Sequence, residues 1–167
     1  MRRLLLASAV LIALLASAQS MTAQSDYLGA VGLRLGPAFG ITGKYFVTPS
    51  WAVEGHFSGR RRGFEMTALA EKHHDLGLWR RLNGFYGGGA HVGFAEYQDG
   101  IEGFQRNRVT AGLDAVAGLE YTFQALPINV ALDWKPEYNI TGATGFCAWC
   151  GGVSVRYAIT GHRYRSW

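Results

Sequence analysis

Strict two-residue alternation over the segment 109–138 limits what this chain can fold into more than any other feature of the sequence. In the run VTAGLDAVAGLEYTF, residues of one parity, such as Val109 and Leu113, are apolar, whereas Asp114 and Glu120 share the other parity. A β-strand places successive side chains on opposite faces, whereas a helix would scatter these charges around its surface. The run INVALDWKPEY repeats the pattern after the short break QALP, so the sequence predicts a hairpin of two long strands.

The two faces of this hairpin differ sharply, because one is wholly apolar and the other carries full charges such as Asp133, Lys135 and Glu137. A strand of a soluble sheet buries its apolar face and exposes its polar face. A strand of a membrane barrel does the reverse, with lipid outside and charges in the interior. Alternation alone leaves both interpretations open.

The N-terminal sequence MRRLLLASAVLIALLASAQS has the layout of a secretory signal peptide, with two arginines, an apolar run and a small-residue cleavage motif. We expect residues 1–18 to be removed by cleavage after Ala18, or as late as Ala23, which leaves residues 19–167 as one barrel domain. A membrane anchor is the alternative, but the run of about twelve apolar residues is shorter than the roughly 20 that span a bilayer as a helix.

Composition narrows the class of protein further. The chain has 23 glycines but only 4 prolines, and its hydrophobic content of 49% argues against disorder. Glycine at this density within alternating runs suits curved, closely packed sheets. The formal net charge of +4 includes Arg2 and Arg3 of the signal peptide, so the remaining chain lacks the strongly basic balance of a nucleic-acid-binding protein.

Alternation continues along the rest of the chain and predicts eight strands, although the segment 64–72 also fits a helix. The expected strands are 28–35, 39–45, 51–58, 64–72, 85–95, 109–123, 128–138 and 153–159. Residues 73–83 and 96–108 are expected to be connections without strand structure. Eight antiparallel strands of about 9–11 residues make the smallest membrane-spanning barrel.

Aromatic residues support the membrane interpretation, because they fall at both ends of the expected strands, as interfacial girdles require. If the strands alternate in direction, one rim carries Tyr27, Tyr45, Trp51, Tyr86, Tyr121, Phe123 and Tyr157, and the other carries Phe39, Phe57, Phe64, Phe94 and Tyr138. Trp134 lies near the middle of its strand and is an exception.

The runs VGLRLGPAFGITGKYF, FYGGGAHVGF, GLEYTF…PINVALDWKPEYN and GGVSVRYAI resemble the small eight-stranded outer-membrane β-barrels. They are similar to the OmpA transmembrane domain and especially to the glycine-rich outer-membrane β-barrel proteins of Bacteroidetes-type bacteria. The resemblance implies an all-β, eight-stranded antiparallel up-and-down transmembrane β-barrel in the outer membrane of a Gram-negative bacterium. Family members commonly stop at a terminal aromatic residue of the last strand, whereas here Thr160 to Trp167 follow Ile159.

The resemblance also suggests partners. We expect outer-membrane lipids around the barrel. Arg60, Arg61 and Arg62 lie in an expected outer loop, where they are either a solvated charged surface or a contact for the phosphates of lipopolysaccharide. The outer-membrane assembly machinery should read the last strand. We expect a monomer with no nucleic-acid partner, no cofactor and no metal ion.

Charged residues of the polar face should fill the interior, because an eight-stranded barrel is just wide enough for side chains. The expected network comprises Arg34, Lys44, Glu54, Asp114, Glu120, Asp133, Lys135, Glu137 and Arg156, together with Glu65 and Glu71. Buried charges are tolerated when they are paired and hydrogen-bonded, so we expect salt bridges that fix the strand register. The alternative is a narrow path for ions or protons, or a gated pore.

A weak catalytic signal lies on the segment 51–58, where His56 and Ser58 share a face with Glu54. A base beside a hydroxyl, oriented by a carboxylate, is the minimum for acyl transfer, and lipid A deacylase barrels carry a similar His-x-Ser. Those enzymes present the pair to the membrane, whereas the alternation here points both residues inward. We therefore assign no catalytic residues.

Cys147 and Cys150 form the one cysteine pair of the sequence. An even count in an exported protein suggests a disulfide that tightens the loop before the last strand, and two free thiols are the alternative. A redox pair would need a helix N-terminus, and a zinc site would need two further ligands that the spacing does not supply.

Together these features predict an outer-membrane barrel, porin-like in architecture, with a structural, adhesive or weakly transporting role. The first alternative is a soluble periplasmic barrel, similar to a lipocalin, that binds a small apolar ligand. The second is a lipid-modifying enzyme of the outer membrane.

Overall fold

The structure is a computed structural model that describes residues 27–60, 63–98, 105–142 and 145–159. The expected signal peptide and the eight residues after Ile159 lie outside the described residues. Within the described ranges, no helix is long and apolar enough to cross a membrane.

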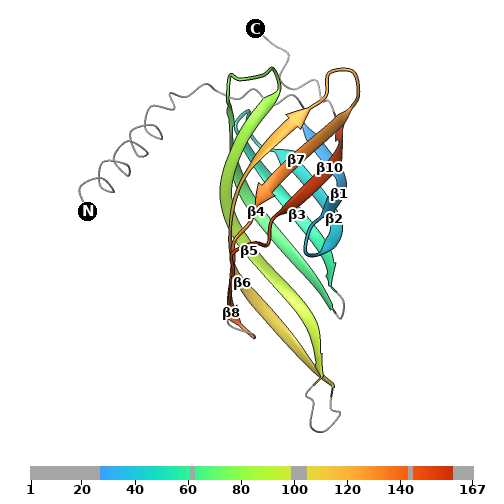
Figure 1. The fold of residues 1–167 in the computed structure, drawn as a ribbon, viewed down its shortest axis with the longest axis vertical. Helices are drawn as coiled ribbons and strands as arrows, with labels where there is room; N and C mark the ends of the chain where they lie inside the picture. Colours follow the sequence, from blue (N-terminus) through green and yellow to red (C-terminus); the bar gives the residue numbers. More distant parts are fainter. Residues whose placement is uncertain (1–26, 61–62, 99–104, 143–144, 160–167) are drawn as a thin grey trace, which may run out of the picture.

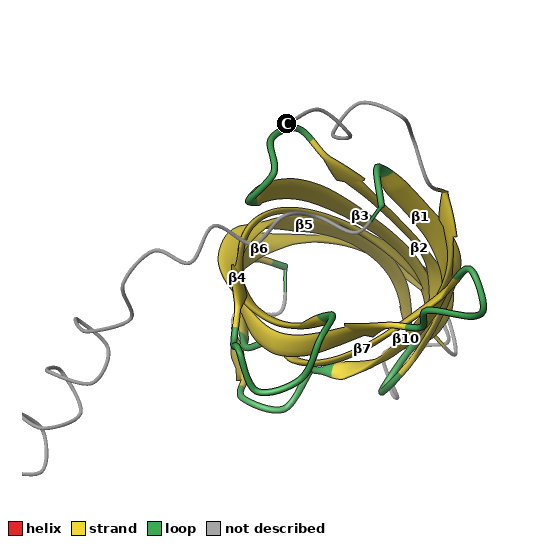
Figure 2. Ribbon diagram, turned by 90° about the horizontal axis from the view of Figure 1, so that it is seen from above, coloured by secondary structure: helices red, strands yellow, loops and turns green. Residues whose placement is uncertain are grey.

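Eight strands close into a single antiparallel barrel, which confirms the predicted fold (Figure 2). The strands of the wall are β1 (Gly29–Leu35), β2 (Phe39–Phe46), β3 (Trp51–Arg60), β4 (Gly63–Asp75), β5 (Leu82–Gln98), β6 (Gln105–Thr122), β7 (Ile128–Trp134) and β10 (Gly152–Ile159). Each strand pairs with the next along the wall, and β1 pairs with β10 from Gly29↔Ile159 to Leu35↔Val153. This last pairing leaves the wall without an open edge, so backbone donors and acceptors are satisfied around the ring.

Two short strands extend the wall on one side. The strand predicted over 128–138 is interrupted at Lys135 and Pro136, and β8 (Glu137–Thr141) then continues along β6. Proline has no backbone N–H to donate, but its carbonyl still accepts the Ala115 N–H at 3.0 Å. The three-residue strand β9 (Gly145–Cys147) pairs with β8, so it extends the wall beyond β10.

The wall is uneven in height. We call the end where β1 begins and β10 ends the terminal end, and the opposite end the distal end. β5 and β6 have 17 and 18 residues, whereas β1 has 7. The β5–β6 hairpin therefore projects far beyond the other strands at the distal end (Figure 1).

The predicted lengths of two connections were wrong. Residues 96–108 were expected to lack strand structure, yet β5 and β6 remain paired as far as Gln98↔Gln105. Backbone pairing needs no apolar face, so a run of polar residues can continue the ladder.

Residues 73–83 were likewise expected to be a connection, but β4 runs to Asp75 and β5 begins at Leu82. The remaining turn is tight, with the Gly77 N–H bonded to Asp75 Oδ1 at 2.8 Å and the Leu82 N–H bonded to the Trp79 carbonyl at 3.1 Å. The segment 64–72 is a strand and not a helix, as the alternation favoured.

The two faces of the wall have opposite chemistry. Apolar side chains of the outward parity remain exposed, for example Ile41 at 58% and Leu132 at 59%. Charged side chains of the inward parity are buried, for example Glu71 at 1% and Arg156 at 2%. The interior is therefore charged and the exterior apolar, which is the reverse of a soluble barrel.

Glycine lets the wall curve tightly between β4 and β5. A Cβ on Gly87 or Gly89 would collide with the carbonyl oxygen of Ala70 or Ala68 on the neighbouring strand. Side chains at these two inward positions would push the strands apart, which explains part of the high glycine content.

Candidate functional site

The lumen contains all the charged residues that the sequence predicted to point inward, and each is between 1% and 8% exposed. The set is Arg34, Lys44, Glu54, Glu65, Glu71, Asp114, Glu120, Asp133, Lys135, Glu137 and Arg156. Their ion pairs gather around three cations, Lys44, Arg34 and Lys135.

The terminal cluster surrounds Lys44, which projects from β2 near the terminal end. Its Nζ lies 2.7 Å from Glu71 Oε2 and 3.0 Å from both Glu54 Oε2 and Glu120 Oε2. The three carboxylates come from β3, β4 and β6, so one ammonium ties four strands together across the lumen. The three short contacts offset the cost of burying the ammonium.

Arg156 of β10 completes the terminal cluster. It pairs with Glu54 through Nη2 and lies 3.6 Å from Glu120 Oε2 through Nη1. Its other hydrogens reach Asn129 Oδ1 at 3.2 Å and Thr42 Oγ1 at 3.3 Å. This guanidinium therefore links β10 to strands on both sides of the closure between β1 and β10.

Aromatic side chains cover the terminal cluster at the terminal end. Tyr27 donates its hydroxyl hydrogen to Glu120 Oε1 at 2.8 Å and packs edge-on against Phe46 at 5.1 Å between ring centroids. His73 packs between Phe46 and Phe85, at centroid distances of 4.8 and 5.2 Å. The ammonium of Lys44 lies 4.4 Å from the Phe85 ring centroid.

These aromatic contributors to the lumen were not predicted from the sequence, and the expectation that Tyr27 lies in the interfacial girdle was wrong, because its ring is buried inside the lumen at 3% exposed. Phe85 and His73 have the inward parity of their strands, but Phe85 is apolar and His73 was placed in a connection. Extending the alternation of β4 by one more step would have found His73.

Arg34 and Asp133 form a separate pair on the wall formed by β1, β7 and β10. Arg34 donates from both Nη atoms to the carboxylate of Asp133, with the Nη2 to Oδ1 distance at 2.6 Å. Arg34 Nη1 also lies 3.3 Å from Ser154 Oγ. Such a two-pronged contact fixes geometry more strongly than a single hydrogen bond.

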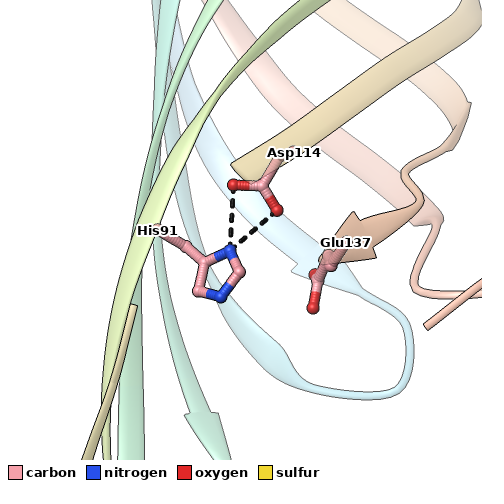
Figure 3. Close-up of side chains that lie close together, drawn as sticks. All are labelled: His91, Asp114 and Glu137. Atoms are coloured by element: carbon pink, nitrogen blue, oxygen red, sulfur yellow. Dashed lines mark hydrogen bonds and ion pairs between the residues drawn. The ribbon is translucent and has the colours of Figure 1, made fainter. Parts of the chain in front are cut away.

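The distal cluster, formed by Glu65, His91, Asp114, Lys135 and Glu137, lies further from the terminal end. Lys135 Nζ is 2.8 Å from Glu137 Oε1 but 3.9 Å from both Glu65 Oε1 and Asp114 Oδ1. His91 Nδ1 lies 3.0 and 3.1 Å from the two oxygens of Asp114 (Figure 3). Glu137 projects toward the same space from β8, as Figure 3 shows.

Asn139 orients the His91 ring, because its Oδ1 lies 2.8 Å from His91 Nε2. The sequence analysis named neither His91 nor Asn139 as a site residue. Their inward parity was visible, but the register that brings Asp114 opposite Glu137 and Gly112 opposite Asn139 was not.

The weak catalytic signal takes a different geometry from an acyl-transfer site. His56 Nε2 contacts Glu54 Oε1 at 2.8 Å, and within the described part of the chain His56 Nδ1 has no hydrogen-bond partner. Ser58 shares the inward face of β3 and is 7% exposed, so neither residue faces the exterior. The absence of catalytic residues remains an expectation.

Cys147 and Cys150 are joined by a disulfide with an S–S distance of 1.99 Å. It closes the loop between β9 and β10, and Trp134 Nε1 donates to the Ala148 carbonyl at 2.5 Å inside that loop. Trp134, the exception to the girdle pattern, is thus an anchor for this loop. Trp149 projects from the loop and is 82% exposed.

Comparison with known proteins adds support for the fold alone. No protein-family model matches the sequence, and a search of curated proteins finds no match. Among solved structures, the chain is similar to the N-terminal β-barrel domain of Pseudomonas aeruginosa OprF, with a TM-score of 0.63 and 14% identity over 80% of this chain and 97% of that one. The predicted likeness to Bacteroidetes-type barrel proteins is not tested by these comparisons.

Proposed function

We propose that the protein is an outer-membrane β-barrel with a structural and adhesive role, in which a closed lumen of ion pairs holds the wall rigid. The observation that carries the proposal is the inverted distribution of side chains. Lys44, Glu71 and Arg156 are buried inside the wall, whereas large aliphatic residues cover its exterior. This arrangement is stable in lipid, where an apolar exterior carries no cost.

Aromatic residues at both ends of the wall support a membrane position. Phe57, Phe64 and Phe94 stack across β3, β4 and β5 on the distal side, at centroid distances of 5.6 and 4.9 Å. Tyr45 and Trp51 are exposed near the terminal end. Belts of this kind sit at the two boundaries between lipid and water. The expected signal peptide accounts for export, and the apolar alternation of β10 suits recognition by the outer-membrane assembly machinery.

A structural role is favoured over transport because the lumen is filled. The three contacts of Lys44 and the contacts of Arg156 cross the barrel, and the aromatic side chains cover them at one end. Any conduction would require these pairs to separate in a low-dielectric interior, so it should be weak.

An adhesive role is suggested by the β5–β6 hairpin. Its strands continue beyond the rest of the wall at the distal end (Figure 1), which faces the cell exterior if the termini lie in the periplasm. A paired, projecting hairpin offers a rigid surface to a partner or to lipopolysaccharide sugars.

The test is to express the chain with its signal peptide, separate inner from outer membranes, and compare gel mobility with and without boiling. We expect the protein in the outer membrane and a faster-migrating band in the unboiled sample. Liposomes containing the purified protein should show little conductance. Recovery as a soluble periplasmic protein without a mobility shift would overturn the proposal.

The lipocalin-like alternative is not favoured, because its ligand would need an apolar interior and the interior here is charged. Lipid modification at His56 and Ser58 remains testable with His56→Ala and Ser58→Ala. An unchanged lipid A profile with both variants would remove that hypothesis.

A further inference from the structure

We propose that the distal cluster binds one divalent transition-metal ion through His91, Asp114 and Glu137, with Zn²⁺ as the reference ion. This inference goes beyond the proposed function, because it depends on the folded barrel and not on where the barrel resides.

The three ligands are already gathered by the strand register. One donor atom of each residue lies within 4.8 Å of those of the other two. They come from β5, β6 and β8, and Asp114 pairs directly with Glu137 across the β6–β8 ladder. Since neighbouring strands of a closed wall hold them, their positions are fixed by backbone hydrogen bonds and not by a loop.

Gly112 makes room for the His91 ring. A Cβ at this position would lie 2.6 Å from His91 Cε1 and 2.9 Å from its Nε2. The ring therefore lies across the backbone of β6 and reaches Asn139 on β8, where Oδ1 is 2.8 Å from Nε2. A metal-ligating histidine commonly donates its second N–H to such an oxygen, which fixes the ring orientation and the tautomer.

When His91 donates its Nε2–H to Asn139, as a metal-ligating histidine would, its unprotonated Nδ1 faces the carboxylate of Asp114. It lies 3.0 and 3.1 Å from the two carboxylate oxygens of Asp114. A nitrogen lone pair that faces two anionic oxygens is repelled unless a positive centre lies between them, which is either a second ring proton or a metal ion. Both His91 and Asp114 side chains are 0% exposed.

The ammonium of Lys135 already supplies a positive charge beside these ligands. Its ammonium is 2.8 Å from Glu137 Oε1 and 3.9 Å from Asp114 Oδ1. It is also 3.3 Å from Thr67 Oγ1 and 3.9 Å from Glu65 Oε1, so the flexible side chain has a second position to lean toward. The Lys135 ammonium therefore competes with a metal ion for Asp114 and Glu137, and a bound metal ion would displace it toward Glu65.

The donor set selects the class of metal. One imidazole nitrogen and two carboxylate oxygens suit Zn²⁺ and its first-row neighbours, with a water as fourth ligand. Ca²⁺ takes six to eight oxygens and Mg²⁺ demands an oxygen octahedron, which three ligands with one nitrogen do not supply. Tetrahedral Zn²⁺ places its donor atoms about 3.4 Å apart, so the side chains must close by roughly 1 Å.

The test uses the full chain, folded as judged by its gel mobility, stripped with a chelator and titrated with Zn²⁺ by calorimetry. We expect one bound equivalent. Asp114→Asn and His91→Ala should each weaken binding by at least about 100-fold, since loss of an outer-shell partner alone costs about 10–100-fold. Lys135→Met should tighten binding by about tenfold or more, because the competing ammonium is gone.

His56→Ala is the matched control, because His56 also contacts a buried carboxylate but belongs to no three-residue ligand group in the described part of the chain. It should leave Zn²⁺ affinity unchanged. Co²⁺ absorption of the wild-type chain gives a second readout that needs no variant, and we expect the intense visible bands of a tetrahedral site.

The proposal is overturned if neither the wild-type chain nor Lys135→Met binds Zn²⁺, which would mean that a ring proton alone balances Asp114. Binding that Asp114→Asn retains, or that His56→Ala loses, would also overturn it, because the ion would then lie elsewhere. Preference for Ca²⁺ or Mg²⁺ over Zn²⁺ would contradict the assigned metal class.

Discussion

The terminal and distal clusters of the lumen each contain one lysine among three carboxylates, yet they hold it differently. Lys44 has three carboxylate contacts between 2.7 and 3.0 Å. Lys135 has one at 2.8 Å and two at 3.9 Å. Electrostatic attraction falls with distance, so the terminal cluster holds its lysine tightly and the distal cluster holds its lysine more weakly.

Burial of the two lysine side chains follows the same order. The Lys44 side chain is 0% exposed and the Lys135 side chain is 4% exposed. Among the carboxylate partners of Lys135, Asp114 is 0% exposed but Glu65 reaches 9%. Tyr27, Phe46 and Phe85 cover the terminal cluster, while the half-buried Asn139 borders the distal one. A lysine among three carboxylates thus forms a fixed junction near the terminal end and an exchangeable cation position in the distal cluster.

The largest expected loss of stability follows from removing the Lys44 ammonium of the terminal cluster. Lys44→Met should destabilise the barrel by about 3–5 kcal/mol, because it removes the ammonium shared by Glu54, Glu71 and Glu120 and leaves Arg156 in contact with only Glu54 and Glu120 of these three. The measurement is the urea midpoint of the unboiled gel band in lipid vesicles. A midpoint equal to that of the wild type would show that Arg156 alone balances the cluster.

At the Arg34–Asp133 pair, the loss of stability from removing one charge can be compared with the loss from removing both charges. Asp133→Asn should destabilise by about 3 kcal/mol, because it leaves the Arg34 guanidinium buried without its anion. The double variant Arg34→Met, Asp133→Leu should recover most of the loss, since an apolar pair needs no charge balance. A double-mutant cycle with the same urea assay measures the coupling. Additive losses would contradict a direct pair.

Lys135→Met sharpens the comparison of the two lysines with the same substitution. We expect a loss of about 2 kcal/mol, smaller than that of Lys44→Met, because the contacts are longer and His91 lies beside Asp114. The two variants are compared in parallel urea titrations. Equal losses would mean that the clusters do not differ as described.

The smallest expected loss of stability follows from removing the disulfide between Cys147 and Cys150. Cys147→Ser with Cys150→Ser should destabilise by about 1–2 kcal/mol, because the loop that the disulfide closes is short and its closure entropy is small. Protease digestion of vesicles should nick this loop faster in the variant, while the mobility shift on gels is retained. Loss of the folded band would contradict this expectation, because it would show that the barrel needs the disulfide to fold.

Local alternation predicted the strands of the wall and the residues that share a face. Each residue of β2, β3 and β7 that parity placed inward or outward lies on that side, because a closed wall with one charged face and one apolar face leaves no freedom to shift register by one residue. The hairpin of β6 and β7 was readable for the same reason, with Ala117↔Trp134 and Thr122↔Asn129 as its ends.

Strand length and long-range grouping were not predictable in this way. Polar residues continue β5 to Gln98 because the ladder needs only backbone groups, and no periodic signal marks its end. Which carboxylates meet Lys44 and which meet Lys135 depends on the tilt and stagger of the closed wall, which one strand's sequence does not contain. Asn139 joined the distal cluster through the break at Pro136, which restarts the strand as β8.

The central claim is that the apolar face meets lipid and the charged face fills the interior. Spin labels at Leu33→Cys and Leu132→Cys, in a chain with Cys147→Ser and Cys150→Ser, report this directly in lipid vesicles, because both native residues are at least half exposed on the outer wall. We expect high accessibility to oxygen and low accessibility to a water-soluble nickel reagent at both positions. High accessibility to the nickel reagent with little oxygen contact would contradict the claim and invert the faces.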